Sequence, residues 1–147
     1  MTHIPVIIAG PGVPAREVPD QIRIVDLMPT ALELLHVSAP KAVQGVSLLP
    51  LARGGHLSLV AQSESWYPRY HYGWSELLSV QDSRFQYIRA PRPELYDLQT
   101  DPRERTDRAR DEAARVCGLD SALTQHLARV ASATAAKGPQ VVDSESE

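Results

Sequence analysis

The chain has 147 residues, 43% of them hydrophobic and 22% charged, which predicts a soluble globular protein able to bury a core. Its 15 lysines and arginines against 18 acidic residues give a net charge of -3, which argues against nucleic acid as a partner, because nucleic-acid-binding modules carry a basic excess. The single cysteine excludes an internal disulfide and a multi-cysteine zinc site. No apolar run approaches the roughly 20 residues that span a bilayer, and none resembles a signal peptide.

The first element expected along the chain is a strand over Ile4–Ala9. This apolar run is rich in β-branched residues and ends at Gly10–Gly12, as a strand buried on both faces of a parallel sheet does. Such a strand needs a neighbour on each side. The opening residues are therefore expected to belong to the edge of a larger sheet.

A helix is expected over Thr30–His36, starting from cap signals at Asp26–Pro29. Its inward face is expected to bury Ala31, Leu32 and Leu35.

Beyond residue 56 the hydrophobic pattern takes the period of strands, with Asp82–Ser83 as an acceptable hairpin turn. The pattern predicts a small antiparallel sheet with one solvated face. The four expected strands are Leu57–Ala61, Leu77–Val80, Phe85–Ile88 and Glu94–Leu98.

The last expected element is a helix with one apolar stripe, and its spacings of three and four residues place Cys117 on the inner side as a small buried group. Residues 133–147 are small, polar and acidic, which predicts a disordered tail. The stripe consists of Val116, Leu119, Leu123, Leu127 and Val130.

Chemical motifs are sparse. The five histidines are scattered without metal-ligand spacing, there is no G-x-S-x-G nucleophile elbow, and Gly10–Gly12 is a strand-ending turn rather than a phosphate loop. The histidines are therefore expected to be structural or surface residues. They are His3, His36, His56, His71 and His126.

One segment is chemically unusual. Residues 64–74 hold both tryptophans and three of the five tyrosines, in a loop expected between two strands. Its rings, beside Arg69 and His71, could stack on a sugar or aryl group and hold an anion. The alternative is an ordered loop whose rings cover the sheet, and the sequence leaves both open.

Several blocks of the sequence occur together in a known order. They resemble the C-terminal portion of a sulfatase, of the alkaline-phosphatase-like superfamily, over residues 3 to about 115. The blocks are His3–Val13, the "VDLxPTLLxL"-like Val25–Leu35, Gly45–Leu51, and the "ELYDLxxDPxE"-like Glu94–Glu104.

The resemblance implies an α/β fold that becomes α+β in its C-terminal half. Residues 1–56 would form the edge of the alkaline-phosphatase-like α/β sheet. Residues 57–132 would form the small four-stranded antiparallel sheet with its terminal helix, and 133–147 the acidic tail.

Sulfatases hydrolyse sulfuric esters with a formylglycine, made from the Cys or Ser of a C/S-x-P-x-R motif, and a divalent cation, usually calcium. In this chain Gly12 stands where the nucleophile of Gly12–Arg16 would be, and Cys117 lacks the following proline. No catalytic or metal residue is carried over, so calcium and formylglycine are implied only for an intact parent. The chain alone is expected to be inactive, and to act on a sulfate ester only when completed by an N-terminal part.

The resemblance leaves the biological form of the chain open, as a fragment, a truncated reading frame or one half of a split protein. The small sheet of intact relatives packs beside the active-site mouth, which makes Arg69, His71 and Trp74 candidate substrate contacts. Two alternatives remain: a non-catalytic module that binds a ligand or partner through residues 64–74, and a phosphoester hydrolase or phosphotransferase of the same superfamily.

Overall fold

The computed structural model describes residues 4–137 of the chain, with side chains to residue 132. The chain divides into two compact units, with the boundary between Ala61 and Gln62. Each unit is described by itself below.

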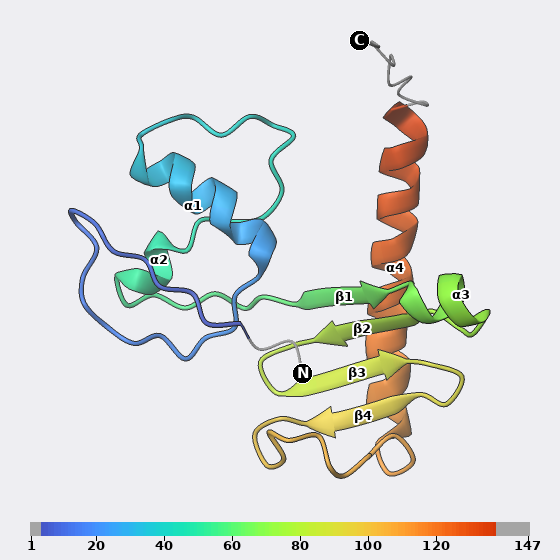
Figure 1. Cartoon of the computed structure of the whole chain (residues 1–147). Helices are drawn as coiled ribbons and strands as arrows, with labels where there is room; N and C mark the ends of the chain where they lie inside the picture. The colour runs from blue at the N-terminus through green and yellow to red at the C-terminus, as the bar shows by residue number, and fades with distance from the viewer. Residues whose placement is uncertain (1–3, 138–147) are drawn as a thin grey trace. The chain divides into compact units, whose positions relative to one another are not determined.

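The first unit is built from short helices joined by irregular segments (Figure 1). A turn of 3-10 helix, η1 (Ile24–Asp26), leads into α1 (Leu27–Leu34), and α2 (Leu49–Ala52) follows after a long connection. The buried apolar side chains of this unit lie at Leu48, Leu49 and Leu51.

A buried carboxylate organises this unit. Asp26 accepts hydrogen bonds from the Arg23 guanidinium at 2.7 Å and from the backbone N–H of Val46 at 2.9 Å. Thr30 continues the network, because its hydroxyl donates to the Asp26 carbonyl oxygen and accepts from the Leu48 N–H. Gly45 lets the chain approach this closely, since a Cβ there would collide with the backbone of Val25 and φ is +89°. The expected helix motif is thus also a hydrogen-bonding hub.

Two expectations for the first unit are wrong, one about a strand and one about the buried face of the helix. Ile4–Ala9 does not form a strand, and Ile7 is 92% exposed. The physical reason is that strand pairing needs a neighbour, and all four strands found in residues 4–137 belong to another sheet.

The helix starts three residues earlier than expected and ends at Leu34. Of the three side chains expected to be buried, Ala31 and Leu35 are exposed and Leu32 is half-buried. The residues buried instead are Asp26 and Thr30, because the hydrogen-bond network and not an apolar core covers that side of the helix.

The second unit holds a four-stranded sheet in the order β1-β2-β3-β4, with neighbouring strands antiparallel (Figure 1). This confirms the expected small antiparallel sheet, although β1 begins four residues later than predicted. The hairpin between β2 and β3 turns at Asp82, whose side chain accepts the N–H groups of Arg84 and Phe85. The strands are β1 (Ala61–Ser65), β2 (Leu77–Gln81), β3 (Phe85–Arg89) and β4 (Glu94–Asp97).

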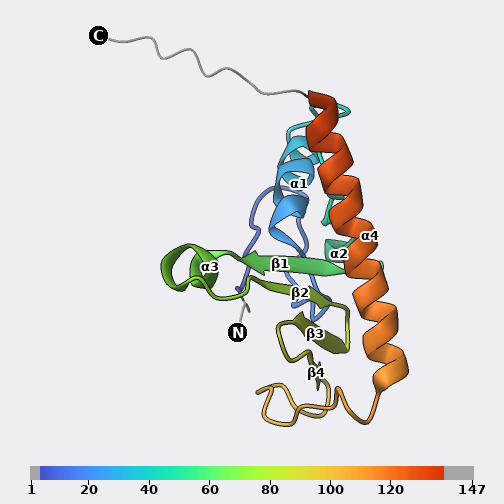
Figure 2. The same ribbon diagram turned by 90° about the vertical axis from the view of Figure 1, so that its right-hand side faces the viewer.

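The long helix α4 (Ala113–Lys137) covers one face of this sheet (Figures 1 and 2). Leu123 is buried between helix and sheet, where Val116, Leu119 and Leu127 are partly buried, which confirms the apolar stripe except at the exposed Val130. The sheet side of the core is formed by Leu78, Val80, Phe85, Tyr87 and Leu95.

Two details of α4 differ from expectation. Cys117 is exposed rather than buried, because its neighbours in the stripe point inward one residue away. The helix also continues to Lys137, past the expected start of the disordered tail at residue 133, and residues 138–147 lie outside the described part.

Polar contacts fix the helix on the sheet at one point. Asp120 of α4 accepts hydrogen bonds from the Tyr87 hydroxyl at 2.8 Å and from Arg89 Nε at 2.7 Å. Arg89 also donates to the hydroxyl of Thr124. These directed bonds hold α4 in one register along the sheet.

A second buried carboxylate closes β4. Asp97 accepts Arg84 Nη2 at 2.8 Å and the backbone N–H of Gln99 at 3.2 Å, and Arg108 Nη1 lies 3.7 Å away. The hydrogen bond from Arg84 lowers the pKa of Asp97 to about 2. The aspartate of the "YDL" block, Asp97, therefore has a structural role: it stabilises the end of β4.

We expect this carboxylate to make stability depend on acid. Its pKa in the fold lies below the ordinary 3.8, so its stabilisation is complete above that value and is lost as the pH falls towards about 2. Urea unfolding at pH 7 and pH 3 measures it, with Asp97→Asn as the comparison. The gap in unfolding free energy between the two proteins should shrink at pH 3, and a constant gap would contradict the assignment.

Candidate functional site

The unusual aromatic residues lie at one end of the second unit. The aromatic segment (residues 64–74) contains α3 (Tyr67–Tyr72), a short helix between β1 and β2 where the sequence predicted a loop. Pro68 favours its first turn, and Gly73 ends it with a left-handed φ of +65°. In Figure 2, α3 projects from the side of the sheet opposite to α4.

The rings of this segment contact each other and lie outside the hydrophobic core. One group joins Trp66 and Tyr70, whose ring centroids are 6.2 Å apart. A second group joins Tyr67 to His71 at 4.1 Å, and Tyr72 to Trp74 at 5.1 Å. These rings stay exposed, Trp74 to 68%, so they do not form the cover over the sheet that was the alternative expectation.

The structure places the three sequence-predicted contacts in different surroundings. Arg69 pairs with Glu76 at 3.0 Å, and its guanidinium carbon lies 5.5 Å from the ring centre of Trp66. His71 and Trp74 belong to the second ring group. The backbone of Glu76 and the nearby Arg69 hold the pKa of the Glu76 carboxyl below its usual range.

Sequence reasoning included Tyr70 and Tyr72 in the segment without assigning them contacts, and it missed Glu76. Tyr70 and Tyr72 supply ring contacts, and Glu76 neutralises the arginine. The signal was present as aromatic pairs at i and i+4, Trp66 with Tyr70 and Tyr67 with His71, and it becomes legible only once the segment is known to be helical.

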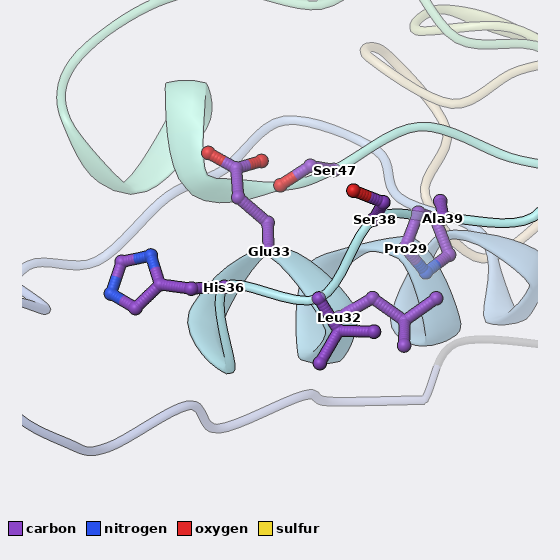
Figure 3. A pocket seen from close by; sticks show the side chains of 8 residues that line it. Pro29, Leu32, Glu33, His36, Ser38, Ala39 and Ser47 are labelled. Atoms are coloured by element: carbon purple, nitrogen blue, oxygen red, sulfur yellow. The ribbon is translucent and has the colours of Figure 1, made fainter.

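The first unit has an open hollow of about 430 Å³ beside α1 (Figure 3). In the figure the Glu33 side chain rises from α1 towards the segment that carries Ser47, while His36 extends in another direction. The lining polar groups do not converge on one point, so the hollow is a weaker candidate. It is lined by Pro29, Leu32, Glu33, His36, Val37, Ser38, Ala39 and Ser47.

Catalytic machinery for ester hydrolysis does not assemble among the described residues. No three His, Cys, Asp or Glu side chains come together there as metal ligands. Gly12 has no side chain to act as a nucleophile, and Cys117 is a free thiol on α4. The residues that the structure describes therefore do not fit a calcium site or a formylglycine. No helix in the described part is both long and apolar enough to cross a membrane.

Comparison with known proteins decides the family. Residues 1–133 match the family described as N-sulphoglucosamine sulphohydrolase, C-terminal. The chain belongs to the sulfatases. Its matched region is the C-terminal domain of this family, as the order of the sequence blocks had indicated.

Relatives of this sulfatase chain agree. It is 32% identical over 123 residues to a Delta 4,5-hexuronate-2-O-sulfatase of Bacteroides thetaiotaomicron, covering 76% of this chain and 25% of the relative. A solved structure in complex with its substrate D-glucosamine-2-N,6-O-disulfate matches with TM-score 0.57 and 26% identity, over 69% of this chain and 23% of the other. The phosphonate monoester hydrolase of Agrobacterium radiobacter matches with TM-score 0.54 and 26% identity, over 71% and 24%.

These matches also show how much of its relatives' length the chain covers. It spans about a quarter of the length of the relatives it matches. The sulfatases among these neighbours have the alkaline-phosphatase-like α/β fold, which agrees with the fold class expected from the sequence.

Proposed function

We propose that this chain is the C-terminal, substrate-facing part of a sulfuric ester hydrolase, and that it is inactive without an N-terminal part. The observation that carries this is the family match over residues 1–133, in a chain whose Gly12–Arg16 block has no nucleophile. A bound calcium and a formylglycine would supply the Lewis acid and the nucleophile in the completed enzyme.

The first unit supplies the surface for this completion. Ile4–Ala9 has the composition of a buried strand, yet Ile4 is 64% and Ile7 92% exposed. An extended apolar segment with open backbone groups pairs readily with another strand. We assign residues 1–56 to the α/β domain completed in this way, and 57–132 to the small sheet and its helix.

The second unit supplies contacts to the substrate. The aromatic segment presents Arg69, His71 and Trp74 on one short exposed stretch, where rings and polar groups alternate. Such a surface suits a ligand with both apolar faces and hydroxyl groups. Since relatives act on a hexuronate sulfate or bind a glucosamine disulfate, the substrate class is a sulfated sugar.

Activity measurements test this function directly. The purified chain with calcium should not hydrolyse an aryl sulfate above the background of a blank preparation. In a chimera, this chain would replace the C-terminal quarter of the Bacteroides 2-O-sulfatase. The chimera should hydrolyse a 2-O-sulfated unsaturated hexuronate faster than the same enzyme without its C-terminal quarter.

Two results would count against it, and a third would favour an alternative. Metal-dependent turnover by the 147-residue chain alone would mean that a catalytic centre lies within it. A chimera that unfolds cooperatively but turns over no faster than the truncated enzyme would mean that the chain does not complete a sulfatase. A chain that unfolds cooperatively and binds a ligand, in a chimera that does not hydrolyse it, would favour a non-catalytic binding module that uses residues 64–74.

A second reaction has an observation in its favour. The similarity to a phosphonate monoester hydrolase places a phosphorus ester among the candidate substrates. Assaying the same chimera on an aryl phosphate and an aryl phosphonate beside an aryl sulfate separates the two. Preference for the phosphorus esters would assign the chain to a phosphoester hydrolase or phosphotransferase.

A further inference from the structure

Tyr72 and Trp74 form a ring pair of the aromatic segment in which both side chains are more than half exposed. Their side chains are 58% and 68% exposed, and their centroids lie 5.1 Å apart with planes tilted by 33°. Gly73 between them ends α3 in a left-handed turn, which sets the direction in which Trp74 leaves the helix. Two adjacent rings held by a helix end form an apolar surface with little entropy left to lose on binding.

The charged side chains of this region already make polar contacts. Glu64 accepts the indole N–H of Trp66 at 2.7 Å, and Arg69 pairs with Glu76 at 3.0 Å. A sulfate approaching Arg69 would have to displace Glu76 from it. The cluster therefore offers its neutral rings more readily than a cation.

The composition around the rings also restricts the occupant. Residues 64–76 contain no Leu, Ile, Val or Met, the side chains that line grooves for apolar helices. The exposed large apolar side chains are all rings, among which Tyr67, Tyr70 and Tyr72 carry hydroxyl groups. A pyranose has the matching chemistry, with C–H groups on its faces and hydroxyls at its edge.

We propose that Tyr72 and Trp74 stack on the C–H face of a sugar ring of the substrate and recognise the ring independently of its sulfate. Arg69, presented above among the substrate contacts, is then a positioning residue, which braces Trp66 and Glu76 and does not hold the sulfate. This inference rests on the proposed function, because that function supplies the sugar as the substrate class.

Fluorescence of Trp74 gives the test. In the full chain carrying Trp66→Phe, Trp74 is the remaining tryptophan, and it reports on binding of two uronate–glucosamine tetrasaccharides, one sulfated and one unsulfated. Both should change its emission, with Kd values within about threefold of each other. Raising the salt to about 0.5 M should leave both values nearly unchanged, because a neutral contact is not screened.

Substitutions locate the site. Tyr72→Ala should weaken binding of both sugars by about tenfold. Tyr70→Ala is the matched control, since Tyr70 is an even more exposed tyrosine that belongs to the other ring group, and it should change the Kd by less than about twofold. Trp74→Ala in the wild-type chain, followed by calorimetry, should lose binding while the melting temperature stays unchanged, because this side chain is outside the core.

Three results would overturn the inference. Neither sugar binds; or the sulfated sugar alone binds, with steep salt dependence and loss in Arg69→Ala; or Trp74 is covered by a second copy of the chain, seen as a dimer in sedimentation. Failure of the proposed function is read separately, from hydrolysis by the chimera. If the chimera shows no turnover but the chain still binds both sugars, the proposed enzyme function is wrong and the inference that Tyr72 and Trp74 bind a sugar ring stands.

Discussion

Truncating Leu95 to alanine is expected to lower the unfolding free energy of the second unit by about 2–5 kcal/mol. Leu95 is 0% exposed and packs in the core between the sheet and α4. Its backbone is held on both sides, with its N–H donated to Asp107 at 3.0 Å and its carbonyl accepting Arg108 N–H at 2.8 Å. Because β4 cannot move inward, the cavity would stay open and the cost should lie high in the range.

Urea unfolding followed by the helical signal of α4 measures this loss. The matched control is Leu77→Ala, a leucine of β2 that is 39% exposed, and it should cost less than about 1 kcal/mol. Equal losses for the two leucines would mean that the sheet face under α4 is not the core of this unit.

The second large effect is expected in the first unit, at Asp26. Burial alone raises the pKa of this carboxyl, but hydrogen bonds from Arg23 and Val46 outweigh it and the pKa lies below its usual range. Asp26→Asn keeps the shape and replaces one acceptor oxygen by a donor that faces other donors. The loss should be about 2–3 kcal/mol, since the broken hydrogen bonds involve a charged group and leave buried partners unsatisfied.

Hydrogen exchange is the suitable readout, because it reports on this unit alone. The amides of Val46 and Leu48 should exchange about 30-fold faster or more in Asp26→Asn. Glu33→Gln, an exposed carboxylate on α1, is the control and should leave both amides unchanged. Unchanged protection in Asp26→Asn would show that the carboxylate does not hold the segment around Val46 to α1.

The sequence predicted an element well where its bounds follow from the local residue pattern, and poorly where they follow from pairing with another segment. The strands β2, β3 and β4 fall within a residue of their predicted ends. Burial alternates along β2 and β4, as one face packed on the core requires, whereas β3 is buried at Phe85, Gln86 and Tyr87 in succession. β1 was displaced by four residues, since its sequence, Ala61–Ser65, is polar and its bounds are set by pairing with β2.

The candidate site divides in the same manner. The concentration of aromatic residues in 64–74 is visible in the sequence, and so are Arg69, His71 and Trp74. Which ring meets which was not predictable, because the contacts follow from α3 being a helix ended by Gly73. The pairing of Arg69 with Glu76, seven residues away, follows from the same turn. Because of this pair, the arginine is neutralised and is not a free cation for a sulfate.

By itself the sequence determined the antiparallel sheet with its covering helix and the lack of a nucleophile at Gly12, because these follow from residue types and local periodicity. It indicated the sulfatase family through the order of blocks that resemble those of that family. Only the tertiary structure decided that Asp26 and Asp97 are structural carboxylates, that Ile4–Ala9 is unpaired among the described residues, and that Trp74 is open while Arg69 is neutralised. Hydrogen-bond partners and strand neighbours are separated along the chain, so no local pattern encodes them.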